Sequence, residues 1–262
     1  MTLTLKRIEG FIKYKDLLKQ LVLKDVKLKY RRSFLGYVWS VLNPLLIMCV
    51  MTLVFSTVFK RNIENYPVYL FTGQLLFNYM NTSTHQAISS ITSSGALLKK
   101  VYVPKYIFTL AKITSGLVDF FFSLGALILV MVVTGAKFSL YNLLGVFVAF
   151  QLYLFCLGLG LFLAQANVFF RDIQYIYNAV TTAWIYFTPL FYTLDALDPR
   201  VSWLIKHFNP MYFYVGQFRD LVYYNTMPGP KIMLAGWVTA VLMLIIGLYT
   251  FQKNQDKFIL YI

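Results

Sequence analysis

The sequence predicts an all-α protein embedded in a membrane, and three observations support this fold class. Hydrophobic residues make up 59% of the 262-residue chain and charged residues only 13%, about half the share found in soluble globular domains. The apolar residues fall in long runs that are almost free of charge. Basic residues gather at the ends of these runs, as they do in proteins that cross a bilayer.

Six runs are long enough to cross a bilayer, which takes roughly 20 apolar residues per helix. We expect these spanning helices at residues 34–59, 66–88, 113–136, 142–167, 173–194 and 232–252. The sequence contains no stretch that would fold as a soluble domain, so residues 1–262 are expected to form a single transmembrane domain.

Lysine and arginine are shared unequally between the two ends of these helices. Sixteen fall on the side that carries residues 1–33, the 99–105 loop, the 171–172 turn and the C-terminal tail, and seven fall on the opposite side. Because short basic loops stay in the cytoplasm, both termini are expected there.

Residues 1–33 are strongly basic and have no signal-peptide features. We predict an amphipathic helix that lies in the cytoplasmic membrane interface. Its apolar face is expected to hold Leu5, Ile8, Ile12, Leu18, Leu21 and Val22.

Residues 195–231 form the longest outward-facing stretch, yet they are rich in apolar and aromatic side chains. Proline interrupts the stretch at Asn209-Pro210. We predict two short helices that dip back into the outer half of the membrane and are separated at this break.

The motif content argues against an enzyme. The chain has no Walker A sequence, no nucleophile motif, no zinc-protease motif and no paired carboxylates. Cys49 and Cys156 lie in apolar runs without metal-ligand spacing, so neither a metal nor another cofactor is expected in this chain. The net charge of +14 follows the pattern of membrane topology, so nucleic-acid binding is not expected.

Asp119 is a carboxylate inside the third predicted span. Lys112 precedes it by seven residues, about 10 Å along a helix, which is too far for a direct ion pair. A capped or interhelical bond is the favoured role for Asp119, and a role in transport is the alternative.

Aromatic residues recur on one face of two predicted spans. These residues are Tyr37, Phe55 and Phe59 in the first span, and Tyr177, Trp184, Phe187 and Phe191 in the fifth. One interpretation is that they face lipid, as many membrane aromatics do. The other is that they line a channel and stack on sugar rings.

Three motifs resemble one known family. Residues 29–44 (KYRRSFLGYVWSVLNP) are similar to the start of the first span in ABC-2 type permeases of bacterial polysaccharide exporters. Residues 98–105 (LKKVYVPK) resemble the cytoplasmic loop between spans two and three of that family, and residues 167–173 (NVFFRDI) resemble its turn between spans four and five. The motifs occur in the family's order, so the resemblance covers essentially the whole chain.

The resemblance implies six spans per subunit, a homodimer in the bacterial inner membrane and a re-entrant hairpin after span five. It also implies two copies of a separate ATPase subunit, which would bind ATP and magnesium. The substrate implied is a lipid-linked polysaccharide of the O-antigen, teichoic-acid or capsule type. An ABC-2 exporter of drugs or lipids and a membrane scaffold without transport remain as alternatives.

Three groups of site residues are expected from this resemblance. Arg31 and Arg32 would attract the substrate pyrophosphate, although ordinary cytoplasmic anchoring also explains them. The aromatics of spans one and five would guide sugars. The coupling surface for the ATPase would include Lys99, Lys100, Arg171 and Asp172, where Asp172 has the alternative roles of a local salt bridge or a helix cap.

Overall fold

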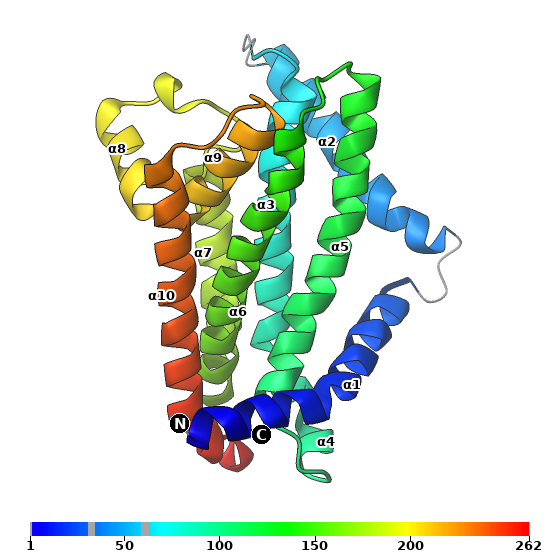
Figure 1. Ribbon diagram of the computed structural model, residues 1–262, viewed down its shortest axis with the longest axis vertical. Coiled ribbons are helices and arrows are strands. Elements are labelled where there is room, and N and C mark those ends of the chain that lie inside the picture. Colours follow the sequence, from blue (N-terminus) through cyan, green and yellow to red (C-terminus); the bar gives the residue numbers. More distant parts are fainter. Residues whose placement is uncertain (1, 31–34, 59–62, 262) are drawn as a thin grey trace.

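The computed structural model describes residues 2–30, 35–58 and 63–261, and its helices pack side by side (Figure 1). Five helices run lengthwise through the molecule: α3 (Tyr66–Ile88), α5 (Tyr106–Val133), α6 (Gly145–Phe169), α7 (Ile173–Phe187) and α10 (Pro230–Asn254). Both chain termini and the short α4 (Gly95–Leu98) lie at one end. At the other end lie α8 (Pro199–Phe208) and α9 (Pro210–Val222).

Four helical stretches are long and apolar enough to cross a membrane: Gly36–Phe55, Tyr106–Val133, Leu140–Phe169 and Pro230–Leu260. α7 does not qualify because its 15 residues reach only about 22 Å at about 1.5 Å per residue. α3 is long enough at 23 residues but carries many amide and hydroxyl side chains. The all-helical membrane fold predicted from the sequence is confirmed, with four candidate spans in the described part of the chain.

Helix boundaries differ most from the prediction at two places, by seven residues each. α5 begins at Tyr106, seven residues before the predicted 113, because Lys112 is tolerated inside the helix once it pairs with Asp25 at 2.8 Å. α7 ends at Phe187 and not at 194, because Pro189 has no backbone N–H and holds Thr188 in an extended conformation.

The N-terminal segment forms α1 (Thr2–Tyr30), a single helix as predicted. Its first part crosses the end of the molecule that holds the termini, and its C-terminal part rises beside α5 (Figure 1). Leu18 and Leu21, two residues of the expected apolar face, pack with Tyr14 against Ile107 and Phe108 of α5. This apolar face is therefore covered at least in part by protein.

α6 and α10 approach each other closely through two glycines. A Cβ atom built on Gly158 of α6 would lie 2.4 Å from the Met243 carbonyl carbon, and one on Gly247 of α10 would lie 2.1 Å from the Gly158 oxygen. Because neither backbone can move without separating the helices, only glycine fits at this crossing.

The segment after α7 forms two helices that meet at Asn209-Pro210, where the sequence predicts the break. The Asn209 side chain accepts hydrogen bonds from the Met211 backbone N–H (3.0 Å) and the Trp184 indole N–H (2.8 Å). Its amide group donates to the Phe187 carbonyl at 3.0 Å. One buried asparagine thus caps α9 and joins it to the end of α7.

A buried arginine fixes α9 against α3. The Arg219 guanidinium donates to the backbone carbonyls of Tyr69, Pro189 and Leu190 and stacks 3.7 Å from the centre of the Tyr69 ring. Gly73 leaves the necessary room, since a Cβ there would lie 2.8 Å from an Arg219 nitrogen. This cation is stabilised by carbonyl dipoles and a tyrosine face.

Candidate functional site

Asp119 forms an interhelical ion pair, one of the two kinds of bond that the sequence favoured. Its carboxylate lies 2.9 Å from the Lys29 ammonium of α1. Lys112, two turns earlier on α5, pairs with Asp25 of α1 at 2.8 Å. α1 supplies the cation of the first pair and the anion of the second. Together the two pairs hold the C-terminal end of α1 beside the middle of α5.

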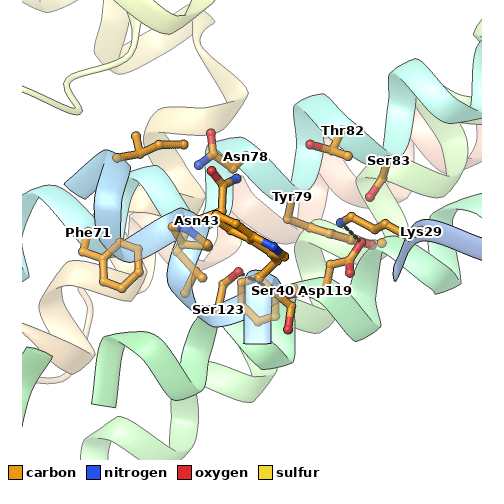
Figure 2. A pocket seen from close by; sticks show the side chains of 16 residues that line it. Lys29, Ser40, Asn43, Phe71, Asn78, Tyr79, Thr82, Ser83, Asp119 and Ser123 are labelled. Carbon is orange, nitrogen blue, oxygen red and sulfur yellow. Dashed lines mark hydrogen bonds and ion pairs between the residues drawn. The ribbon is translucent and has the colours of Figure 1, made fainter. Parts of the chain in front are cut away.

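A cavity of about 460 Å³ opens next to the Lys29–Asp119 pair (Figure 2). Its walls come from α2 (Trp39–Val58), α3 and α5, with Lys29 supplied by α1. Asp119 is the fourteenth of the 28 residues in α5, so the cavity lies near the middle of a helix that can cross a membrane.

The cavity wall mixes polar and aromatic side chains. Asn43 of α2 and Asn78 and Thr82 of α3 are exposed in it, and Trp39 contributes an aromatic ring that is 39% exposed. Ser83 also lines it, but its hydroxyl is buried against Gly116 of α5. This lining is suited to a hydrated or hydroxyl-rich occupant.

Polar side chains continue along α3 beyond the cavity. Asn78 and Thr82 share a helix face with Asn81 and His85, at spacings of three and four residues. The His85 ring lies 4.9 Å from the Tyr177 ring of α7. This polar face therefore extends from the cavity beside α2 toward α7.

α7 carries a second polar stripe. Gln174, Asn178 and Thr182 recur every fourth residue, share one face and are all exposed. An unpaired amide facing hydrocarbon costs several kcal/mol, on the order of a lost hydrogen bond in an apolar solvent. The stripe is thus unsuited to lipid and needs water, substrate or another protein surface.

The predicted aromatics of α7 occupy different surroundings. Tyr177 is buried, and its hydroxyl lies 2.7 Å from the Thr84 hydroxyl of α3. Trp184 and Phe187 are half-buried, and Trp184 donates to Asn209 as described above. Phe191 lies beyond the helix end.

Phe55 and Phe191 join the two groups of predicted aromatics. Their rings stack with centroids 4.8 Å apart, so the end of α2 contacts the segment after α7. Tyr37 is 49% exposed and lies in the helical turn before α2. Phe59, Arg31 and Arg32 lie outside the described residues.

The residues expected to contact an ATPase lie at the end of the molecule with both termini. Lys99 and Lys100 follow α4, and both are exposed. Arg171 donates to the Tyr261 carbonyl at 3.3 Å, and the Asp172 side chain makes no capping hydrogen bond to α7. The capping role considered for Asp172 is therefore not observed.

The C-terminal turn (Gln255–Leu260) joins the predicted coupling elements. Lys105 donates to the Gln255 carbonyl and lies over the Phe258 ring, 5.5 Å from its centre. Burial lowers the pKa of the Lys105 ammonium, and nearby Asp256 partly offsets this effect. Phe258 packs against Phe169, which precedes the Arg171-Asp172 turn.

The amide residues of α3 and α7 were not identified from the sequence as candidate site residues. Their signal is the recurrence of Asn, Gln and Thr every three or four residues inside otherwise apolar segments. This signal is weak, because neutral amides do not interrupt a hydrophobic run as a charge does.

Comparison with known proteins places these features in a family. The model of the ABC-2 type transporter family matches residues 16–223. The O-antigen export system permease protein RfbA of Myxococcus xanthus is 31% identical over 97% of this chain and 98% of its own length. An RfbA permease of Klebsiella pneumoniae is 28% identical over 93% of each chain, and the polysialic acid transport protein KpsM of Escherichia coli is 22% identical over 84% of each. The protein belongs to the ABC-2 type transporter family.

Proposed function

We propose that this protein is the transmembrane subunit of an ATP-driven exporter that moves a lipid-linked polysaccharide out of the cytoplasm. Relatives named for O-antigen export and polysialic acid transport, aligned over most of the chain, support a polysaccharide substrate. The drug or lipid exporters considered as alternatives have no support among these names.

The observation that best supports a polysaccharide substrate is the polar surface formed by amide and hydroxyl side chains of α3 and α7. In this proposal α3 crosses the membrane with the four apolar helices, and α7 does so together with the residues up to 194 that follow it, which gives six spans. The re-entrant hairpin is formed by α8 and α9. Polysaccharide hydroxyls exchange hydrogen bonds with water for hydrogen bonds to amides and hydroxyls such as Asn78, Asn178 and Thr182. Because these groups are neutral, they hold no sugar tightly and let the chain move past.

A homodimer would cover the exposed stripe of α7. Gln174, Asn178 and Thr182 face outward from the single chain, and lipid cannot satisfy their amide groups. Two copies that meet across this face would enclose a path lined from both sides. The half-buried Trp184 and Phe187 lie on the same helix and would add flat apolar surfaces for sugar rings.

The lipid anchor of the substrate would remain in the bilayer. Extracting a polyprenyl chain would lose about 0.8 kcal/mol per CH₂, whereas the sugars and pyrophosphate are expensive to move through hydrocarbon. Arg31 and Arg32 precede α2 in the sequence and in this proposal attract the pyrophosphate.

Two copies of a separate ATPase would bind at the end that holds both termini, which we assign to the cytoplasm. That end combines Lys99, Lys100 and Arg171 with large exposed apolar side chains, among them Tyr102 at 90% and Phe170 at 71%. A surface of this kind suits an acidic partner with an apolar pocket. ATP and magnesium would be bound by the partner.

The export assay that tests this proposal compares two threonines. Thr182 in the α7 stripe and Thr250 in α10 each donate a 2.8 Å hydrogen bond to the carbonyl four residues earlier in their own helix. We expect Asn178→Leu combined with Thr182→Val to reduce surface polysaccharide in a strain that lacks the native gene, with glycan accumulating on the cytoplasmic lipid carrier. Thr250→Val should export normally.

Normal export by the Asn178→Leu/Thr182→Val variant would contradict a path along α7. Failure of the unaltered protein to restore any surface polysaccharide would contradict the proposed function itself. Protein abundance in the membrane, measured for each variant, separates loss of transport from loss of folding.

A further inference from the structure

We propose that the cavity between α2, α3 and α5 is a binding site for a neutral sugar unit within each protomer. The inference rests on the proposed function for the source of that sugar, the glycan being exported. It concerns a site distinct from the outward stripe of α7, since α2, α3 and α5 enclose it within one chain.

The position of the cavity requires a polar occupant. Asn43, Asn78 and Thr82 are exposed to it near the middle of α5. Lipid tails would leave these groups unsatisfied at a cost of several kcal/mol in total. Water or hydroxyl-bearing ligands satisfy them.

The arrangement of donors and acceptors matches a sugar. Each asparagine offers an amide donor and a carbonyl acceptor, which together bind vicinal hydroxyls. The Trp39 ring in the same wall provides a flat apolar surface for the C–H face of a pyranose. The cavity volume of about 460 Å³ lies within the range of about 300–1,000 Å³ found for small-molecule sites.

Charge favours a neutral ligand over a phosphate. The charged groups in the described lining are Lys29 and Asp119, and these are bonded to each other at 2.9 Å. A phosphate would have to compete with the Asp119 carboxylate for the Lys29 ammonium and would be repelled by it. The hydroxyls of an uncharged sugar meet no such penalty.

The cavity also connects to the proposed path. Asn78 and Thr82 belong both to its wall and to the polar face of α3 that extends toward α7. A sugar held beside α2 could therefore pass along α3 without losing its hydrogen-bonding partners. We infer that the cavity holds a sugar unit before it joins the path between the two copies.

Tryptophan fluorescence tests the binding step without ATP or transport. The full-length protein with its ATPase, in lipid nanodiscs, is titrated with neutral methyl glycosides and with the corresponding sugar 1-phosphates. We expect a saturable change with at least one neutral glycoside, which disappears in Trp39→Phe and persists in Trp203→Phe on α8. The Asn43→Leu/Asn78→Leu variant should bind at least about tenfold more weakly, the effect of about 1.4 kcal/mol.

Matched variants identify the cause. Asn142→Leu, in the turn before α6 and outside the cavity lining, should retain binding. Asp119→Asn removes the negative charge beside Lys29 and should shift the preference toward sugar 1-phosphates. Tighter binding of sugar 1-phosphates by the unaltered protein, or no saturable change with any neutral glycoside, would overturn the assignment.

The export assay provides a separate arm. Normal export by the Asn43→Leu/Asn78→Leu variant would show that the glycan does not bind in the cavity during export, and it would leave the proposed function intact. Absence of export by the unaltered protein would count against the proposed function, and the nanodisc titration would still decide whether the cavity binds sugar.

Discussion

At the scale of single residues, Arg219 joins three segments of the described structure through one buried side chain. Its guanidinium is buried and reaches three backbone carbonyls, one of which belongs to α3 and two to the segment after α7. Its neighbour Gly73 must lack a side chain for the guanidinium to fit. The residue therefore determines how the end of α7, α9 and α3 are joined.

We expect Arg219→Leu to destabilise the protein by about 3 kcal/mol, because it leaves buried carbonyls without donors. Arg219→Lys should recover only part of this loss, since an ammonium cannot reproduce the planar fork of hydrogen bonds. Thermal unfolding of the purified protein in detergent measures both effects. Equal stability of the Leu variant and the unaltered protein would show that the carbonyls find other donors.

The sequence identified some residues better than others. Asp119 was expected to form a capped or interhelical bond, and its partner Lys29 lies 90 positions away, which spacing along one helix cannot reveal. Tyr177 and Phe191 were grouped as one aromatic face, but Phe191 lies beyond the helix because Pro189 ends the regular structure first. Residue type was predictable, whereas partner and orientation depended on contacts between distant segments.

At the scale of elements, two helix contacts depend on different interactions: α6 and α10 pack closely at glycines, and α1 and α5 are joined by ion pairs. The α6–α10 crossing depends on Gly158 and Gly247. The contact between α1 and α5 depends on two ion pairs, Asp25–Lys112 and Lys29–Asp119. α1 contributes the negative charge to the first pair and the positive charge to the second. Sliding α1 by one turn would place like charges next to each other, so the pairs also fix the register of α1 along α5.

Gly247→Ala should separate α10 from α6 and destabilise the protein by about 2 kcal/mol, because the new methyl group would overlap the Gly158 backbone. Gly125→Ala on α5 is the matched control, since a Cβ there meets nothing within 4 Å. Thermal unfolding should show a large decrease for the first variant and no decrease for the second. A similar response of both would mean that loss of glycine, and not helix crowding, is responsible.

A charge exchange tests the register of α1. Asp25→Lys alone should weaken the contact with Lys112 by about 1 kcal/mol, and adding Lys112→Asp should restore much of that loss by re-forming the pair in reverse. A disulfide between cysteines introduced at neighbouring positions of α1 and α5 reports the register in each variant. Additive losses in the double variant would contradict direct pairing.

Helix boundaries show which elements the sequence predicts well. Residues 66–88 were predicted as a span and are the bounds of α3, because Asn65-Tyr66-Pro67 marks its start with proline in the first turn. The break at Asn209-Pro210 followed from the same rule. The start of α5 was misplaced because Lys112 is neutralised by α1, which is a tertiary contact.

At the scale of the whole molecule, the two ends have different chemistry. One end gathers both termini, exposed lysines and the C-terminal turn, and the other holds α8 and α9 with the buried Arg219. The polar faces of α3 and α7 lie between these ends. Movement at the first end can reach α6 through the contacts of Phe258 with Phe169, and α10 through those with Phe251.

We expect Phe258→Ala to loosen the C-terminal turn, because it removes a fully buried ring that packs on Phe169 and Phe251. The tail should become sensitive to protease, and export per ATP hydrolysed by the reconstituted complex should fall several-fold if the turn relays motion. Phe162→Ala, at a partly exposed site of α6, is the control. Unchanged coupling with a protease-sensitive tail would limit the turn to a structural role.

The polarity of α3 has a consequence for how the protein is made. A segment with so many amide and hydroxyl side chains partitions poorly into lipid when it leaves the translocon by itself. α5 and α6, which bury most of α3 in the finished fold, are synthesised after it. We therefore expect α3 to remain at the insertion site until these apolar helices emerge, so that the three enter the lipid together.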